Sequence, residues 1–523
     1  MGSKQRLAQV SEALAKITRF ARFLPFLAIS VVPAAVLAAL VLPFVRWGFS
    51  DDDNFIDFYV QGKSPPMPIS ATDGRFWPFG HQEWRLLPHM TEAFSYHLVA
   101  SLQFAAVCIL SALFLSTLSS QFLDGREKSE RILLASFIAV TTPPVLISFA
   151  NIVVPERNQI LLIIIFLVCV QRAAVSKHKY ILLAVACVSM NASLYFKEPT
   201  VLFYFGYLAA ELGFRTMPLG LPNRPLNGAD RLFLVSCLAS IALYFRLYVY
   251  FIPLFDRICE NKLYHYAQPG VGRIPQQIIW YFMNEPILWA YAVLLYSVFL
   301  WTMIAGKWEP KLQMMIRSTF PIFLGGALYF LFICATGLGS RYYQAVSFYS
   351  FSIVISAFVL VIDRKKVATV LVVGLVFLQT SLAVPSLIYK YDWTNRNYRI
   401  VQMIRSMESQ NLTFDIRGNW WDVFSLVNYA RQIEGLQAVL YCDQTYRHET
   451  LDGRPLCSAK PAEVIPDVVV ELSDVVVVPP SIDYRREARF LRDGKVIWQS
   501  GSVWYDRIPD EIRSLLQSQY RFW

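Results

Sequence analysis

Three consecutive carboxylates, Asp51, Asp52 and Asp53, directly follow the first long apolar segment of this chain, within the sequence SDDDNFID. Like charges at this spacing repel one another, and a nearby lipid surface disfavours charge further, so the pKa of at least one of these carboxyls is expected to rise. A carboxylate with a raised pKa beside a membrane is a candidate general base, able to take a proton from a hydroxyl group. The same run is also typical of a helix cap followed by a solvated turn.

Cations that could complete such a site lie in three short segments between later apolar stretches. Arg157 belongs to PERN, Lys197 to KEP and Arg341 to GSRYY. Because a short loop holds its side chains at helix ends, these cations are expected to converge on one anionic group, such as a lipid phosphate. Glu156 and Glu198 lie next to two of them, and the alternative there is an interfacial ion pair within each loop. For Arg341 the alternative is a side chain that extends to interfacial water.

Two longer segments carry polar and aromatic side chains that could contact the molecule whose hydroxyl group is deprotonated. Both segments have room for interfacial helices. These candidates are Asp73, Arg75, His81 and Glu83 within 48–95, Lys262 and His265 within 254–285, and Tyr342 beside Arg341. The aromatic stretch 76–84 is also typical of interfacial packing. Three histidines, at 81, 89 and 97, recur along the first segment, but Pro88 interrupts it and no tight ligand spacing accompanies them. We therefore expect no metal site and no cofactor, with a divalent ion as the open alternative.

The elements that must position these residues are membrane-spanning helices. Of the 523 residues, 55% are hydrophobic and 16% are charged, whereas soluble domains carry about 25% charged residues. A helix of about 20 apolar residues crosses the hydrocarbon core of a bilayer. About eleven stretches approach this length, at 24–47, 96–118, 131–152, 158–173, 180–195, 199–213, 232–253, 286–305, 318–336, 345–362 and 367–389. The predicted fold is an α-helical polytopic membrane protein of about eleven transmembrane helices with a C-terminal extracytoplasmic α/β domain.

Basic residues mark every second loop of this arrangement. They cluster within 1–23 and then at 126–131, 172–179, 215–231, 307–317 and 364–366. Cytoplasmic loops carry an excess of Lys and Arg, so the pattern puts these loops in the cytoplasm and 48–95, 254–285 and the tail on the outer face. Residues 1–23 are basic and amphipathic, without an obvious cleavage site, which favours a cytoplasmic interfacial helix over a removed signal peptide. We expect a bacterial inner membrane protein with a periplasmic C-terminal domain. The net charge of +10 comes from these loops and does not indicate nucleic acid.

Residues 24–389 form the predicted transmembrane domain, and residues 390–523 a small α/β domain, because apolar runs shorten there and turn residues multiply. Helices are expected at 398–408, 420–433 and 510–517, a strand at 437–441, two β-branched runs within 468–478, and a hairpin of 496–498 with 503–505. Cys442 and Cys457 both lie in this tail, where an oxidising compartment favours a disulfide. The other six cysteines lie in or beside apolar stretches, as expected of small packing residues.

The acidic run after the first span, the short outward loops with Glu-Arg and Lys-Glu pairs, the many spans and the outward C-terminal domain together resemble the GT-C superfamily of membrane glycosyltransferases. The resemblance covers the topology of the membrane part. At residue level it rests on Asp51 to Asp53, which match the family's acidic motif in the first outward loop.

The resemblance implies a polyprenyl-phosphate-linked sugar as donor and an envelope glycan, such as lipopolysaccharide or its O-antigen, as acceptor. One carboxylate, preferably that of Asp52 or Asp53, would deprotonate an acceptor hydroxyl, which would attack the anomeric carbon with inversion. Arg157, Lys197 and Arg341 would stabilise the charge that develops on the lipid phosphate.

Two other functions are compatible with the sequence. A polysaccharide polymerase or ligase also uses lipid-linked sugars outside the membrane, but it would favour a large central loop and arginine-rich loops, whereas the main domain here is terminal. A non-catalytic transporter or scaffold for lipid-linked glycans would tolerate neutral residues in place of the Asp run. The chain contains no Walker A sequence, no dinucleotide-binding glycine fingerprint and no HExxH motif.

Overall fold

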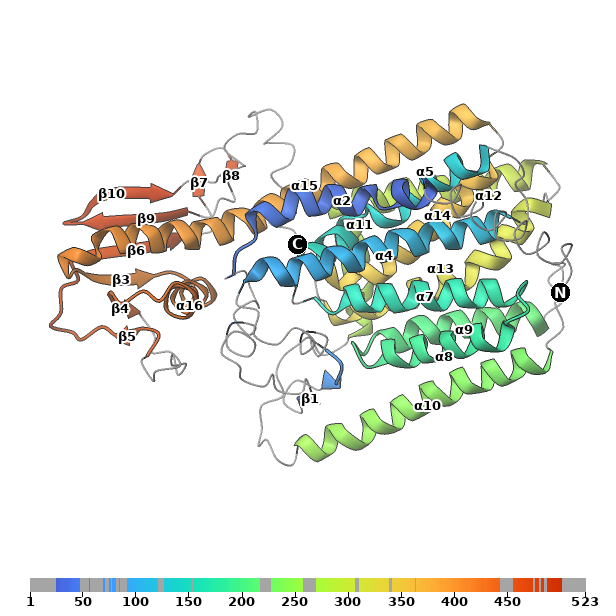
Figure 1. The fold of residues 1–523 in the computed structure, drawn as a ribbon, viewed down its shortest axis with the longest axis horizontal. Helices are drawn as coiled ribbons and strands as arrows, with labels where there is room; N and C mark the ends of the chain where they lie inside the picture. The colour runs from blue at the N-terminus through green and yellow to red at the C-terminus, as the bar shows by residue number, and fades with distance from the viewer. Residues whose placement is uncertain are drawn as a thin grey trace, which may run out of the picture.

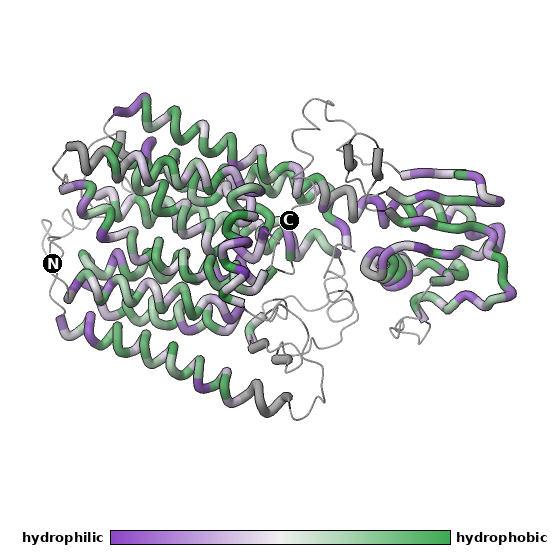
Figure 2. The backbone as a smooth tube through the Cα atoms, turned by 180° about the vertical axis from the view of Figure 1, so that it is seen from behind, coloured by the Kyte–Doolittle hydropathy of each residue, from purple (hydrophilic) through white to green (hydrophobic). Residues whose placement is uncertain are grey.

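The computed structural model describes residues 25–47, 56, 69–70, 75–76, 78–80, 84, 92–120, 127–152, 154–216, 227–256, 270–305, 310–337, 341–362, 364–442, 455–473, 476–478, 481–483 and 487–500. Figure 1 shows a bundle of helices and, beyond one end of it, a small sheet. We call the end of the bundle that faces this sheet the domain end. The opposite end, which carries the basic clusters at 172–179 and 364–366, is called the basic end. Figure 2 shows that the bundle helices are mostly hydrophobic, whereas hydrophilic residues are frequent in the sheet part.

The bundle contains the following helices, most of which run along its long axis (Figure 1). They are α2 (Val32–Val41), α4 (Ala93–Ser119), α5 (Glu127–Val140), α6 (Pro143–Ala150), α7 (Glu156–Ala173), α8 (Lys179–Leu194), α9 (Thr200–Thr216), α10 (Gly228–Asp256), α11 (Ile274–Asn284), α12 (Pro286–Ala305), α13 (Pro310–Thr336), α14 (Ala345–Val361) and α15 (Lys365–Met407). Short 3₁₀ turns are η1 (Leu42–Phe44), η4 (Val271–Arg273) and η5 (Arg341–Gln344), and a two-stranded ribbon joins β1 (Ile69–Ser70) to β2 (Arg75–Phe76).

Five of the described helices are long and apolar enough to cross a membrane, or seven segments if each of two bent pairs counts as one span. The five are Ala93–Ser119, Gly228–Tyr250, Pro310–Thr336, Arg341–Val361 and Lys365–Ile388. The predicted count of about eleven spans is not confirmed. Three predicted spans, α7, α8 and α9, have only 18, 16 and 17 residues, which is less than the roughly 20 apolar residues that a full crossing needs.

Two of the predicted spans are parts of bent pairs. The stretch 131–152 divides into α5 and α6, which meet at 72°. The pair Pro143-Pro144 opens α6, because proline is favoured in the first helical turn and excludes the preceding residue from the helix. The second bend, of 97°, separates α12 from the helical segment Val271–Asn284. A helix therefore lies within the predicted outward segment 254–285, and Glu285 stands at its bend.

Close contact between α9 and α13 depends on glycine. A Cβ atom on Gly325 would lie 2.5 Å from the carbonyl oxygen of Phe203, and one on Gly206 would lie 2.9 Å from the carbonyl oxygen of Leu324. Because glycine has no side chain, the two helix backbones come into contact at these positions, as is common for helices that pack in a bilayer.

The helix α15 joins the bundle to the sheet part. It runs for 43 residues without a break, so the predicted span 367–389 and the predicted helix 398–408 are one element, and the proposed boundary at 390 falls inside it. Its last turns carry Ile400, Val401 and Ile404, which are buried in the same cluster as the core of the sheet. Full burial of such side chains contributes about 1.5–3 kcal/mol each, which explains why the helix continues beyond the bundle.

The main sheet has six strands in the order β10-β9-β6-β3-β4-β5. They are β3 (Thr413–Arg417), β4 (Val439–Cys442), β5 (Ser458–Ala459), β6 (Val468–Ser473), β9 (Glu487–Arg492) and β10 (Lys495–Ser500). β3 pairs in parallel with β4 and β6, and β9 is antiparallel to β6 and β10. The helix α16 (Trp420–Asn428) continues into a π-helical turn, η7 (Tyr429–Ile433), as predicted for 420–433. A separate ribbon pairs β7 (Val476–Val478) with β8 (Ser481–Asp483).

The hairpin predicted from 496–498 to 503–505 is wrong in its turn, because residues 499 and 500 continue the strand. Residues 496–498 lie within β10, which pairs with the preceding strand β9. The turn between them is Asp493-Gly494, with φ of 52° and 73°, and this dipeptide is typical of tight hairpins because both positions need positive φ. The predicted strand 503–505 and helix 510–517 lie outside the described residues.

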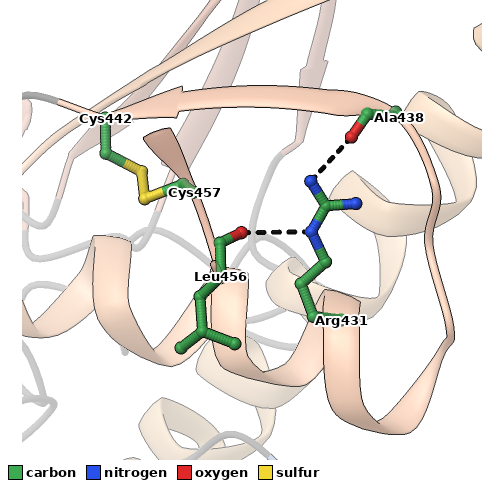
Figure 3. The surroundings of a disulfide bond; sticks show 5 residues. All are labelled: Arg431, Ala438, Cys442, Leu456 and Cys457. Atoms are coloured by element: carbon green, nitrogen blue, oxygen red, sulfur yellow. Dashed lines mark hydrogen bonds between the residues drawn. A yellow bond between two sulfur atoms is a disulfide. The ribbon is translucent and has the colours of Figure 1, made fainter. Parts of the chain in front are cut away.

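The predicted disulfide between Cys442 and Cys457 is confirmed. It ties the end of β4 to the residue before β5, and Figure 3 shows Arg431 beside it. Arg431 donates to the carbonyl oxygens of Leu456 and Ala438 at 3.1 and 2.7 Å. Five other cysteines, at 108, 169, 187, 237 and 334, are free, as predicted, and Cys259 lies outside the described residues.

Candidate functional site

Lys197 lies in the tight turn between α8 and α9, at the domain end. Its ammonium group forms an ion pair with Glu156 in the first turn of α7. It also lies 4.1 Å from the ring centre of Tyr343 and 5.6 Å from that of Tyr342, in η5. The Lys197 side chain is 14% exposed, whereas Glu156 is fully buried. Three segments far apart in the sequence thus meet around one cation.

The partner of Lys197 is itself held deep in the bundle. Oε2 of Glu156 is buried and has no hydrogen-bond partner among the described residues. One helical turn further, Gln159 donates to the hydroxyl of Thr200 and to the carbonyl oxygen of Lys197. These bonds fix the α8–α9 turn against α7, so that the ammonium group and the carboxylate stay together.

Arg157, the next residue of α7, points into a different environment. Its Nε donates to Oε1 of Gln103 at 3.0 Å, and its guanidinium lies 4.5 Å from the ring centre of Trp84. Its NH1 reaches the carbonyl oxygens of Asn151, Ile152 and Val154 at 3.2, 2.5 and 3.2 Å. Arg157 is completely buried. It therefore satisfies backbone acceptors that follow the end of α6 and links α4, α6 and α7.

Arg341, at the start of η5, forms a fully buried ion pair with Glu285 at the α11–α12 bend. Its NH1 also donates to the carbonyl oxygen of Leu382 and to the hydroxyl of Ser386, both at 2.7 Å. Both partners belong to α15. Arg341 thus connects the bent pair to the long helix, and its guanidinium is surrounded by protein acceptors.

Lys390, which the sequence analysis did not name, and His97, named there only among three recurring histidines, also lie at this end of the bundle. Lys390 of α15 is buried and donates to the carbonyl oxygen of Ala150, the last residue of α6. His97 of α4 is 1% exposed, and neither of its ring nitrogens has a partner among the described residues. Lys390 and Arg157 both lie near enough to this histidine to interact with it electrostatically. Basic and aromatic residues are common at membrane interfaces, so the sequence around Lys390 carried no specific signal.

The residues on either side of the Asp run are anchored at this end of the bundle. Trp47 and Ile56 are buried in one cluster with Trp84 and Tyr96, and the cluster continues into the core of the sheet. The ring centre of Tyr96 lies 5.3 Å from that of Trp47 and 5.1 Å from that of Trp84. Ile56 and Trp84, two described residues of the first predicted outward segment, thus share one hydrophobic cluster with the core of the sheet.

The remaining candidates divide into described and undescribed residues. Outside the described residues lie Asp51, Asp52, Asp53, Asp73, His81, Glu83, Lys262 and His265. Arg75 belongs to β2, where its backbone pairs with Ser70. Glu198 is half-buried in the α8–α9 turn, and its carbonyl oxygen accepts a bond from the N–H of Val201.

The partners of Arg157, Lys197 and Arg341 can now be compared with the predicted convergence of these cations on one anionic group. The anticipated ion pair of Glu156 with its neighbour Arg157 does not form; Glu156 pairs with Lys197 instead. The three cations have separate partners, with Arg157 among carbonyl groups, Arg341 on Glu285 and Lys197 on Glu156. Among these three, only Lys197 has an exposed fraction above zero. In the described part of the chain, no group of three His, Cys, Asp or Glu residues is arranged to hold a metal ion.

No protein-family model and no curated protein sequence matches the chain. Among solved structures, it is similar to the crystal structure of ArnT from Cupriavidus metallidurans in the apo state, with 12% identity and a TM-score of 0.45, covering 87% of this chain and 94% of that one. The crystal structure of the same protein bound to undecaprenyl phosphate aligns with 12% identity and a TM-score of 0.43, covering 90% and 98%. At such values these similarities assign neither a family nor an activity to this chain.

Proposed function

We propose that this protein is an inverting membrane glycosyltransferase that moves a sugar from a polyprenyl-phosphate donor to an envelope glycan at the domain end of the bundle. The observation that carries the proposal is the Lys197–Glu156 pair beneath Tyr343. A partly exposed cation among buried helix ends, next to aromatic rings, suits a phosphate whose lipid chain lies along the bundle. Glu156 balances the charge of Lys197 when no donor is bound.

The roles of the other two predicted phosphate ligands follow from their partners. Arg157 and Arg341 are fully buried and donate to protein acceptors. We therefore assign phosphate contact to Lys197, and assign to the two arginines the positioning of the helix ends around it.

The general base is assigned to the Asp run. Asp51 follows Trp47 by four residues and Asp53 precedes Ile56 by three. Since an extended chain spans at most about 3.6 Å per residue, the covalent chain keeps the Cα atom of Asp51 within roughly 14 Å of that of Trp47, and the Cα atom of Asp53 within roughly 11 Å of that of Ile56. Both anchors belong to the cluster that borders Arg157. These tethers support a base at the same end of the bundle as Lys197.

The reaction then needs one proton acceptor and one charge stabiliser. An Asp carboxylate takes the proton of an acceptor hydroxyl, and the oxygen forms a bond to the anomeric carbon from the face opposite the phosphate. The bond between that carbon and the phosphate oxygen breaks, and its electron pair leaves with the lipid phosphate. Lys197 stabilises the additional negative charge. The leaving group is already activated, so the proposed reaction requires neither a nucleotide nor another cofactor.

The periplasmic placement of the domain end and the choice of acceptor are further parts of the proposal. Basic residues at the other end favour a cytoplasmic location for it, and the disulfide suits an oxidising compartment. Lipopolysaccharide or its O-antigen is the proposed acceptor class, and the sheet part, whose core shares a cluster with Ile56 and Trp84, would bind it.

The test uses the full chain in lipid nanodiscs, with a panel of polyprenyl-phosphate hexoses and pentoses, and measures the release of polyprenyl phosphate in the presence of lipopolysaccharide. We expect Asp→Asn at one of Asp51, Asp52 or Asp53 to lower turnover at least about 10²-fold, comparable to the loss of one catalytic group. Asp493→Asn is the matched control, because asparagine tolerates the positive φ of that exposed turn. Full turnover in all three single variants and in the triple variant would overturn the assignment of the base.

A binding measurement tests the phosphate site separately. Lys197→Ala should weaken the binding of polyprenyl phosphate about tenfold or more, with Lys197→Arg retaining part of it. Lys365→Ala removes the same charge at the basic end, where Lys365 pairs with Glu130 at 3.3 Å, and should leave binding unchanged. Equal affinities of the wild type and Lys197→Ala would exclude the proposed pocket.

A further inference from the structure

A groove of about 580 Å³ lies at the basic end, between the last turn of α4 and the turn that joins α7 to α8. Arg172, His178 and four hydroxyl-bearing side chains line it, together with three aliphatic ones. We propose that this groove binds the phosphate headgroup of an anionic phospholipid from the leaflet at the basic end. The site is separate from the Lys197 pocket at the domain end and does not depend on the proposed transferase activity.

The donors that the groove offers to a ligand are those of Arg172 and Ser176, since the hydroxyls of Thr117 and Ser120 donate to the carbonyl oxygens of Leu113 and Thr117. Arg172 is exposed and forms no ion pair within the described part of the chain. Ser176 accepts a hydrogen bond from the backbone N–H of His178 at 3.1 Å, so its own hydroxyl hydrogen can be donated to a ligand. The N-terminus of α8 begins after His178 without a side-chain cap, and its partial positive charge adds to that of Arg172. These donors match the acceptor oxygens of a phosphodiester.

Charge balance distinguishes this groove from the cavity on the other side of the same turn. That cavity, of about 260 Å³, is lined by Lys179 and Arg215 but also by Glu211 and Asp230. Asp230 lies 2.7 Å from Lys179 and 3.3 Å from Arg215, so the cations there are already neutralised. Among the described residues, no Asp or Glu lines the groove that contains Arg172, so its described lining has a net positive charge that suits an anion.

An apolar stripe on α8 indicates that the anion belongs to a lipid. Ile181, which lines the groove, is 64% exposed, and Val185 and Val188 are 41% and 69% exposed. Their spacing of four and three residues puts them on one face of the helix, leading from the groove toward the middle of the bundle. A headgroup in the groove would therefore place its acyl chains along this face. Anionic lipids are typical of the cytoplasmic leaflet, the side predicted for this end.

Native mass spectrometry of the full chain in detergent can test the proposal, by titration with phosphatidylglycerol or with phosphatidylcholine of the same acyl composition. We expect the wild type to bind phosphatidylglycerol several-fold more tightly, and Arg172→Gln to lose about tenfold in affinity for it, as expected when one charge-assisted contact is removed. Its affinity for phosphatidylcholine should stay the same.

Lys177→Gln is the matched control, because Lys177 is an exposed cation in the same turn but does not line the groove. It should change the affinity for phosphatidylglycerol less than twofold. Equal losses in both variants would show a general attraction of basic surface to anionic lipid and would overturn the proposal. Complete displacement of the lipid by excess inorganic phosphate would assign the groove to the free anion instead, and the lack of any lipid preference in the wild type would exclude the site.

Discussion

Removing Glu285 alone should destabilise the bundle strongly, because it leaves the guanidinium of Arg341 buried without its counter-charge. Both side chains are fully buried, and the remaining acceptors of Arg341, among them the carbonyl oxygen of Leu382 and the hydroxyl of Ser386, carry no full negative charge to replace that of Glu285. Breaking a buried pair from one side typically costs about 3–5 kcal/mol. We therefore expect Glu285→Met to lower the free energy of unfolding by about this amount.

The double variant Glu285→Met/Arg341→Met separates this cost from the value of the pair itself. An apolar replacement of both members removes the unpaired charge and is often neutral or stabilising, so it should recover most of the loss. Unfolding in mixed micelles of rising SDS content, followed by fluorescence of the 13 tryptophans, measures the three free energies. A loss below about 1 kcal/mol in Glu285→Met, or a double variant no more stable than the single one, would refute the buried pair.

The same variants separate a positioning role of Arg341 from a direct role in phosphate binding. If Arg341 only holds the α11–α12 bend against α15, the double variant should bind polyprenyl phosphate nearly as well as the wild type. A tenfold or larger loss of affinity in a double variant that is as stable as the wild type would instead favour the direct contact expected from the sequence.

Two further predictions concern packing and pH. Gly325→Ala should lower the free energy of unfolding by about 1–3 kcal/mol, because its Cβ would lie 2.5 Å from a backbone oxygen of α9. Gly374→Ala is the control and should be neutral, since no atom lies within 4 Å of the added Cβ. Equal stability of the two variants would contradict the close helix contact. Thr413, at the start of β3, donates its backbone N–H and its hydroxyl to the carboxylate of Asp467. These two bonds hold the pKa of Asp467 below its usual value of about 4. Because this pKa is lower in the folded state, the bonds stabilise the sheet above the unfolded-state pKa, and the contribution should disappear as the pH falls through the lower folded-state value. Thermal unfolding between pH 6 and 3 should therefore show a steeper loss in the wild type than in Asp467→Asn, and parallel curves would contradict the assignment.

Hydrophobicity predicted the helix positions closely, because the backbone N–H and C=O groups of an apolar stretch in a membrane have to bond to one another within that stretch. The predicted stretches 96–118, 158–173 and 345–362 coincide with α4, α7 and α14 to within a few residues. The bends at Pro143 and at Glu285 did not follow, because a broken span and a continuous one have nearly the same composition. The long helix α15 was divided in the prediction, because its hydrophobicity ends where it leaves the bundle although its hydrogen bonding does not.

The strands of the C-terminal part were predicted less completely. The strand predicted at 437–441 corresponds to β4, and the two β-branched runs within 468–478 correspond to β6 and β7. The pairing of β10 with β9 depends on the Asp493-Gly494 turn, which periodicity alone did not locate. The disulfide was predictable because only two cysteines lie in the tail.

The sequence by itself determined that this is a multi-span membrane protein, which cations lie at helix ends, and which two cysteines bond. Only the tertiary structure decided the partners of those cations. Glu156 and Arg157 are adjacent in sequence, yet successive residues of a helix point about 100° apart, so one meets Lys197 and the other meets the carbonyl groups after α6. The pairs that form join residues 41 and 56 positions apart, at separations that helix packing sets and local sequence does not encode.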